Sequence, residues 1–477
     1  MSRKWLVLMA IACGTFMATL DSSIVNIALR PVAKNLATDL THIKWIVTVY
    51  FLIITCLLLP IGRLSDLFGR KRVFSTGFFI FIFGSALCGL APTLTWLIVS
   101  RVLQGLGAAM LMANGPAIIT STFPATHRGT ALGTLGMVVS AGLISGPAIG
   151  GILIQEMGWR SVFLINIPIG MLGMVLASAF IEDDDKEQDT RRRKELLAKF
   201  DWAGSILQSV IIICLILMFL PSELSLPKAL VNVSEPLLAL LVLILCVIFV
   251  RLESRAEAPV FDLDLIRDMT FWTGNLSAFL TFVAYSTIAV LMPYYLQEGL
   301  SLDTQRTGYL MTAIPITILV TAPISGKLSD VFGSKELCIL GATIECVTLL
   351  MMGGLFGLGL HKDISQNVIV FILCAIGMSI GLFQSPNNNA IMGAVPTEKL
   401  GAASAFMATV RNLALGVGTG FATGVFSWKE AQNGDFIGAM RFTYLAAGVI
   451  AAGAVVSSLG KTRGPHWKKH GLEKKGT

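Results

Sequence analysis

Four ionisable side chains fall inside long apolar stretches of this chain. Asp21 and Arg101 lie in its first half, and Glu345 and Arg411 lie in its second. An ionisable group at membrane depth is costly, so it marks a candidate functional site by default. The carboxyl groups can exchange protons, whereas the arginines keep their charge and can pair with anions. These residue types therefore point to ion movement or ion pairing inside a membrane.

Asp21 lies about two turns from one end of its apolar stretch, roughly 12 Å along a helix axis. Burial and a neighbouring cation act on such a carboxyl in opposite directions, so it could exchange protons near neutral pH. Arg101 is expected at comparable depth, because its stretch runs the opposite way. Two compatible hypotheses follow: a proton-coupling site at Asp21, in which Arg101 takes part, and a structural pair with Arg101.

Glu345 is near the middle of an apolar stretch in the second half of the chain. It could be a second protonation site or the counter-charge for a cationic ligand. It could also be a neutral, hydrogen-bonded glutamate with no function. Arg101 and Arg411 could bind an anionic substrate directly, but a structural or relay role through partner carboxylates is favoured because arginine cannot readily lose its charge.

A charged segment occurs twice. Residues 62–72 read Gly-Arg-Leu-Ser-Asp-Leu-Phe-Gly-Arg-Lys-Arg, and residues 326–336 read Gly-Lys-Leu-Ser-Asp-Val-Phe-Gly-Ser-Lys-Glu. The glycines permit a tight turn with close helix approach, and each aspartate can face the N-terminus of a neighbouring helix. We predict a conformational latch, stronger in the first copy, rather than a simple basic loop. Its residues would be Gly62, Asp66, Gly69, Arg70, Arg72, Gly326 and Asp330.

The apolar stretches themselves predict a polytopic membrane protein. The chain has 477 residues, of which 54% are hydrophobic and only 14% are charged, whereas about a quarter of a soluble chain is charged. A membrane-spanning helix needs roughly 20 apolar residues. The predicted spans are residues 5–29, 44–62, 73–92, 96–120, 130–155, 160–180, 202–220, 232–251, 271–293, 305–325, 337–358, 367–388, 400–424 and 439–460.

The repeat and the charges organise these fourteen spans. The duplicated segment follows the second and the tenth span, which predicts two related six-helix bundles, residues 1–180 and 271–460. A linker with two extra spans, residues 181–270, lies between them, and residues 461–477 form a basic tail. Lysine and arginine gather in the duplicated segments, the linker and the tail, which places both termini in the cytoplasm.

Other classes of function are disfavoured. The eight cysteines all fall in apolar stretches without zinc-site spacing, and the five histidines fall in loops or the tail. The net charge of +7 follows the topology of the loops rather than a nucleic-acid surface. No complete phosphate-binding loop is present. We therefore expect no enzyme, no cofactor and no metal, and an ion gradient as the energy source.

Four motifs in the first half stand in a recognisable order. Residues 62–72 match a loop signature with Leu67 in place of the usual arginine, and residues 20–29 match a first-helix motif. Residues 101–109 match a fourth-helix motif, and residues 142–151 with 159–168 match a fifth-helix motif and its exit. The second half matches less strictly. The chain resembles the major facilitator superfamily, specifically its fourteen-helix drug:proton antiporter branch, which implies an all-α fold of two six-helix bundles.

Small residues recur at near-four spacing in the fifth-helix motif. They let helices pack closely and slide, and the proline bends the helix. The resemblance implies that this segment seals one face of an antiporter, although ordinary packing of glycines is the alternative. The motif residues are Gly142, Gly146, Pro147, Gly150 and Gly151.

The resemblance implies a proton-coupled exporter of drugs or other amphipathic small molecules in a bacterial cell membrane. We expect protons, a small-molecule substrate and lipid as partners, a monomer, and a link to antibiotic resistance. Candidates for a substrate cavity are Asn26, Gln104, Asn387, Asn388 and Arg411, although Asn387 and Asn388 could instead cap a helix. The alternatives are an exporter of one endogenous metabolite or lipid, and a non-transporting membrane sensor or scaffold.

Overall fold

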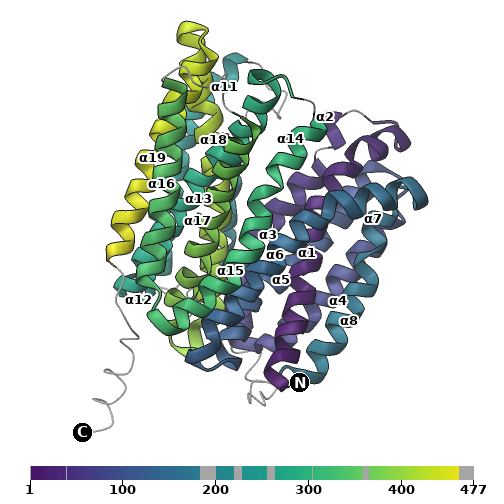
Figure 1. Ribbon diagram of the computed structural model, residues 1–477. Coiled ribbons are helices and arrows are strands. Elements are labelled where there is room, and N and C mark those ends of the chain that lie inside the picture. Colours follow the sequence, from purple (N-terminus) through teal and green to yellow (C-terminus); the bar gives the residue numbers. More distant parts are fainter. Residues whose placement is uncertain are drawn as a thin grey trace. The chain divides into compact units, whose positions relative to one another are not determined.

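The computed structural model describes residues 2–38, 40–43, 45–182, 200–219, 228–254, 264–302, 304–357 and 365–460. All the secondary-structure elements that these residues form are helices (Figure 1). The apolar stretches form helices because lipid offers no hydrogen-bond partner, so every backbone N–H and C=O must be satisfied within the segment. The predicted tail, residues 461–477, and the basic run of the linker, residues 191–194, lie outside the described residues.

The helices of the first part of the chain are α1 (Arg3–Asn35), α2 (Leu40–Ile43), α3 (Trp45–Phe68), α4 (Arg70–Gly89), α5 (Leu94–Thr122), α6 (Ala125–Met157), α7 (Ser161–Leu164), α8 (Asn166–Phe180), α10 (Trp202–Phe219) and α11 (Lys228–Glu253). Those of the second part are α12 (Asp264–Arg267), α13 (Met269–Tyr294), the π-helix η1 (Tyr295–Gly299), α14 (Thr304–Met311), α15 (Ala313–Phe332), α16 (Lys335–Gly357), α17 (Gln366–Gly393), the short 3-10 helix η3 (Thr397–Lys399), α18 (Leu400–Asn433) and α19 (Phe436–Leu459).

Twelve candidate membrane spans are found among the described residues. They coincide with twelve of the fourteen predicted spans and confirm an all-helical membrane protein. The other two predictions, residues 202–220 and 232–251, correspond to α10 and α11. The apolar part of α10 within the described residues, Trp202–Leu215, is shorter than a span. The total of fourteen therefore stays a prediction.

The predicted charged loops are largely helical, which corrects the boundaries expected from sequence. Only Gly69 separates α3 from α4, and only Gly333 and Ser334 separate α15 from α16. The two glycines occupy matching places in the repeat, with φ of 95° and 91°. An L-residue with a side chain rarely adopts this conformation, so glycine allows the chain to turn sharply between consecutive helices.

Two predicted spans are each interrupted. The span at 160–180 divides into α7 and α8 at Ile165, and the span at 305–325 divides into α14 and α15 at Thr312. Helix α17 also extends beyond the predicted end at residue 388, to Gly393. Asn387 and Asn388 consequently lie within a helix, so neither caps a helix end.

The chain divides into two compact units that do not follow chain order. Unit 1 comprises Met1–Pro124, Ala141–Asp264 and Pro396–Thr409, and unit 2 comprises Ala125–Ser140, Leu265–Val395 and Val410–Thr477. Helix α6 thus contributes its first half to unit 2 and its second half to unit 1, and α18 begins in unit 1. The division of the chain into two bundles, a linker pair and a tail stays a prediction.

In unit 1, α4 and α8 pack with α1 and α5, the purple and blue helices of Figure 1. Helices α4 and α5 approach closely because glycines face the contact. A Cβ atom at Gly84 would lie 2.7 Å from the backbone nitrogen of Gln104. Small residues at such contacts are how membrane helices pack without a hydrophobic driving force. This close approach carries polar side chains of α4 and α5 into one place.

In unit 2, α16 packs against α17 and α19, and α13 packs against α19 (Figure 1). Aromatic side chains fill the contact. The Tyr295 and Phe356 rings meet edge to face with centroids 4.9 Å apart, and Phe356 stacks on Tyr444 at 5.7 Å. The core of this unit is therefore apolar, and an ionisable residue within it stands out.

Candidate functional site

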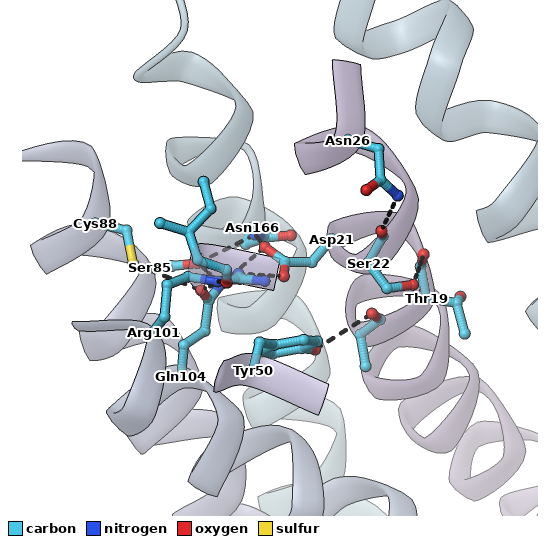
Figure 2. A network of polar contacts seen from close by, with 12 residues as sticks. Thr19, Asp21, Ser22, Asn26, Tyr50, Ser85, Cys88, Arg101, Gln104 and Asn166 are labelled. Carbon is cyan, nitrogen blue, oxygen red and sulfur yellow. Dashed lines mark hydrogen bonds and ion pairs between the residues drawn. The ribbon is translucent and has the colours of Figure 1, made fainter. Parts of the chain in front are cut away.

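A cluster of polar side chains lies at the contact of four helices of unit 1 (Figure 2). Asp21 comes from α1, Ser85 from α4, Arg101 and Gln104 from α5, and Asn166 from α8. All five residues are buried, and Asp21 and Arg101 are 0% exposed. Residues from distant parts of the sequence thus form one closed polar site inside an apolar bundle.

An ion pair forms the centre of this cluster. Nη1 of Arg101 lies 2.6 Å from Oδ2 of Asp21, and the same nitrogen lies 2.6 Å from Oε1 of Gln104. The structure therefore brings together the two residues that the sequence placed at equal depth. A charge-assisted hydrogen bond of this length is among the stronger polar contacts in proteins.

Amide groups bind the second oxygen of Asp21. Oδ1 accepts hydrogen bonds from Nε2 of Gln104 at 2.8 Å and from Nδ2 of Asn166 at 3.0 Å. Both nitrogens also donate to Oγ of Ser85, at 2.7 Å and 3.1 Å. Gln104 thus contacts both members of the ion pair, and its predicted place in a substrate cavity stays a prediction.

The guanidinium of Arg101 is held from several sides. Its Nε donates to the backbone carbonyl of Ile46 at 2.9 Å. Its Cζ lies 4.0 Å from the centroid of the Tyr50 ring and 5.8 Å from that of Phe163. Within the described residues, Nη2 of Arg101 and Oδ1 of Asn166 are buried without a hydrogen-bond partner. The cluster is balanced in charge but leaves one donor and one acceptor unused.

Asp66 contacts the beginning of another helix within unit 1. Its two oxygens accept hydrogen bonds from the backbone N–H groups of Gly401 at 2.9 Å and Ala402 at 2.8 Å, in the first turn of α18. Arg70 donates to Asp66 at 2.9 Å and also to the carbonyl of Thr397. The first N–H groups of a helix lack internal partners and carry partial positive charge, so a carboxylate satisfies both needs.

Asp330 makes the equivalent contact within unit 2. It accepts hydrogen bonds from N–H of Gly129 at 2.7 Å and from N–H and Oγ1 of Thr130, near the beginning of α6. Gly62 and Gly326 allow these approaches, because a Cβ on either would meet the backbone of the contacted helix. We call the Asp66 and Asp330 contacts the two helix clamps.

The remaining latch and motif residues lie as follows. Arg72 is exposed. Gly142, Gly146 and Gly150 face α1, and added Cβ atoms would meet Thr19, Ser23 and Ile24, whereas one on Gly151 would meet nothing within 4 Å. Pro147 lies in α6. The close packing predicted for the fifth-helix motif is thus carried by three of its four glycines.

Glu345 is 0% exposed within α16 of unit 2. Both of its carboxyl oxygens lack a hydrogen-bond partner among the described residues. Tyr285 is close enough to interact with it electrostatically. A buried polar group without a partner costs free energy, about 1–3 kcal/mol, and more for a charged group. The hydrogen-bonded alternative predicted for this residue therefore has no support in the described structure.

The other substrate-cavity candidates do not gather in one place. Asn26 is exposed and donates to the carbonyl of Ser22 on its own helix (Figure 2). Asn387 is buried, and its Nδ2 donates to the carbonyl of Gly274 at 3.2 Å. Asn388 and Arg411 are half-buried. Their assignment to a cavity stays a prediction.

Sequence reasoning missed several members of the Asp21 cluster. Ser85 and Tyr50 were not singled out, and Asn166 appeared only as part of a motif. A serine or tyrosine in an apolar stretch is common, so nothing distinguishes these two before the helices are packed. Asn166 offered a signal, because an asparagine at the beginning of a membrane span needs a polar partner.

Comparison with known proteins identifies the family. The family model described as Major Facilitator Superfamily matches residues 11–261 and 274–477. The chain is 35% identical over 436 residues to the riboflavin transporter RibZ of Clostridioides difficile, covering 91% of both chains. It is 29% identical over 418 residues to the multidrug resistance protein Stp of Mycobacterium tuberculosis, covering 87% of this chain and 74% of that protein.

Among solved structures, the fold is similar to that of the human organic anion transporter MFSD10. The TM-score is 0.70 at 12% sequence identity, and the match covers 96% of this chain and all of the other. At that level of identity the likeness concerns the fold alone. The all-helical fold expected from the motifs is confirmed, whereas the fourteen-helix arrangement stays a prediction.

Proposed function

The chain belongs to the Major Facilitator Superfamily, and from this premise we propose that it is a proton-coupled secondary exporter of drugs or other amphipathic small molecules. It would work by alternating access and belong to the fourteen-helix drug:proton antiporter branch. The observation that carries the proposal is the buried Asp21–Arg101 pair. The multidrug resistance relative supports the substrate class.

The proposed coupling acts through the charge balance of the cluster. When Asp21 is protonated, the guanidinium of Arg101 loses its counter-charge while both groups stay buried. Leaving one member of a buried pair unmatched is costly, about 3–5 kcal/mol. The four helices that supply the cluster must then rearrange. Protonation is thereby linked to the packing of the bundle, which is what a proton-driven conformational change requires.

Glu345 is our candidate for a second coupling site. It is fully buried without a hydrogen-bond partner among the described residues, so a bound proton or a cationic ligand group would satisfy it. Arg411, Asn26, Gln104, Asn387 and Asn388 remain candidates for contact with substrate. Asn26 is exposed and Arg411 is half-buried, so the polar groups of these two residues could reach a substrate.

The helix clamps are proposed to hold one access state. Each aspartate satisfies N–H groups at the beginning of a helix that is distant in sequence, α18 for Asp66 and α6 for Asp330. We propose that both ends of the chain are cytoplasmic, so that both clamps lie on the cytoplasmic side. Loss of a clamp would then favour the state that is open to the cytoplasm.

A second candidate function is transport of one endogenous metabolite. The 35% identity to a protein named riboflavin transporter, over 91% of both chains, favours this alternative specifically. The buried coupling cluster is compatible with either substrate class. The range of substrates distinguishes them: a dedicated carrier should transport riboflavin and no dye, whereas a multidrug carrier should transport several dyes of unrelated structure.

The proposal is tested by separating driven from downhill transport in proteoliposomes. Asp21→Asn should lose substrate accumulation driven by a pH gradient, by tenfold or more, and keep downhill efflux at zero gradient. Asp435→Asn makes the same chemical change at the exposed N-terminus of α19 and should leave both activities intact. Full gradient-driven accumulation by Asp21→Asn would remove the proposed coupling role.

A further inference from the structure

Helix α3 of unit 1 contains a proline in its interior. Pro60 is buried and has no backbone N–H, so it cannot donate to the carbonyl of Cys56, four residues earlier. Inside a membrane such a carbonyl is costly unless a neighbouring helix supplies a donor. A proline is also where a helix bends. Cys56 and Pro60 therefore mark a point at which α3 needs a partner and can change direction.

Helix α10 supplies donors at this point. Nε2 of Gln208 lies 3.4 Å from the carbonyl oxygen of Cys56, and Oγ of Ser209 lies 3.3 Å from the same oxygen. Sγ of Cys56 donates in return to the carbonyl of Ser209, at 3.7 Å. Cys56 and Gln208 are both buried. The single hydroxyl proton of Ser209 is shared with the carbonyl of Ser205 in its own helix, at 2.9 Å, so the amide of Gln208 is the more constant donor.

Helix α3 also connects the two sites described above. On one side of the proline, the carbonyl of Ile46 and the ring of Tyr50 contact the guanidinium of Arg101. On the other side, Asp66 binds the N–H groups at the beginning of α18. The contact with α10 thus lies between the Asp21 cluster and the Asp66 clamp, along one helix of unit 1.

Helices α10 and α11 stand outside both of those sites. The cluster residues come from α1, α4, α5 and α8, and the clamp joins α3 to α18. Helix α10 packs against α3 and α11. Large apolar side chains of α11, such as Leu237 and Leu243, are about three-fifths exposed, at 61% and 62%. The α10–α11 pair can therefore shift on α3 without dismantling the contacts that hold Asp21.

We propose that docking of α10 on the carbonyl of Cys56 holds α3 at a fixed bend and thereby regulates the helix clamp at Asp66. This inference rests on the role proposed above for the clamp. Asp66 lies six residues beyond Pro60, about 9 Å along the helix axis. A change of about 10° in the bend would move Asp66 by about 1.6 Å. Its hydrogen bonds to Gly401 and Ala402 are 2.9 Å and 2.8 Å long, so a shift of that size away from α18 would break them.

Amide hydrogen exchange by the full-length protein in detergent micelles tests this inference without measuring transport. The test variant, Gln208→Met/Ser209→Ala, removes both donors of α10 with little change in side-chain volume. Gln366→Met makes the same glutamine substitution at an exposed position in the first turn of α17 and is the matched control. Asp66→Asn is the reference for a weakened clamp.

We expect the amides of α10 to exchange about tenfold faster in the test variant than in the wild type, the order of magnitude that a buried hydrogen bond contributes. The amides of Gly401 and Ala402 should also exchange faster, as in Asp66→Asn, and the control should match the wild type. Pro60→Ala restores an N–H for the carbonyl of Cys56. In that background the test substitutions should accelerate exchange by less than about twofold.

Four results would each overturn the inference. They are unchanged exchange in the test variant, an equal acceleration in the control, acceleration confined to α10, and an undiminished effect in the Pro60→Ala background. A failure of the proposed transport function would leave these exchange rates as they are, so the two failures are distinguishable.

Discussion

Replacing Asp21 by asparagine should destabilise the protein strongly, although it changes the shape of the side chain very little. The amide oxygen can still accept from Gln104 and Asn166. Its NH2 group, however, would face the guanidinium of Arg101, where the structure has a carboxylate oxygen at 2.6 Å. Both residues are 0% exposed, so water cannot compensate for the lost charge. We expect the free energy of unfolding to fall by about 3–5 kcal/mol.

A double-mutant cycle isolates the pair from its surroundings. Arg101→Gln alone should also lower the free energy of unfolding. In the Asp21→Asn background the same substitution should lower it less, since it then removes a guanidinium that has already lost its counter-charge. We expect a coupling energy of about 2 kcal/mol between the two positions. Asp435→Asn is the matched control, with an expected change below about 0.5 kcal/mol, because aspartate and asparagine are similar N-caps.

The assay is reversible unfolding in mixed micelles with increasing sodium dodecyl sulfate, followed by tryptophan fluorescence and circular dichroism. The chain has eight tryptophans to report the transition. The reasoning would be refuted if Asp21→Asn unfolded within about 0.5 kcal/mol of the wild type. It would also be refuted if the two substitutions were additive, since Arg101 would then not depend on the charge of Asp21.

Three further predictions use the same unfolding assay. Gly146→Ala should lower the free energy of unfolding by about 1–3 kcal/mol, because the added Cβ would meet α1. Gly151→Ala should leave it unchanged or raise it by up to about 1 kcal/mol. Equal effects of the two substitutions would contradict the packing of α6. Glu345→Met should raise the free energy of unfolding by about 1–3 kcal/mol, since it removes two buried oxygens that lack a partner among the described residues. The same substitution should reduce proton-driven transport. A loss of stability would show that the carboxyl has a partner. Asp66→Asn and Asp330→Asn should each lower the free energy of unfolding by about 1–3 kcal/mol, because an amide offers only one acceptor oxygen to two N–H donors. An unchanged transport rate in both variants would contradict the proposal that the helix clamps hold one access state.

Much of the fold follows from local sequence, because lipid imposes a simple rule. A run of about twenty apolar residues must form a helix to satisfy its backbone, so the spans can be identified one by one. The pairing of Asp21 with Arg101 could be anticipated for a related reason. Two opposite charges at one depth in a nonpolar medium have few other partners, and the structure joins them at 2.6 Å.

The details that depend on packing could not be predicted. Ser85 enters the cluster only because Gly84 lets α4 approach α5, and the sequence of either helix alone does not indicate that contact. The charged segment at residues 62–72 suggested a loop by its composition. Gly69 alone turns the chain, because its φ of 95° suits glycine and allows helix on both sides. The identity of the transported molecule depends on contacts that neither composition nor spacing determines.

Exchange of substrate for protons can be measured directly in membrane vesicles. Inverted membrane vesicles containing the protein are loaded with a pH gradient, acidic inside, and a candidate substrate is added while internal pH is followed with a fluorescent indicator. We expect a cationic dye or riboflavin to collapse the gradient in vesicles with the wild-type protein and not in those with Asp21→Asn. Substrate uptake that leaves the gradient unchanged, or that proceeds equally without one, would contradict proton-coupled export.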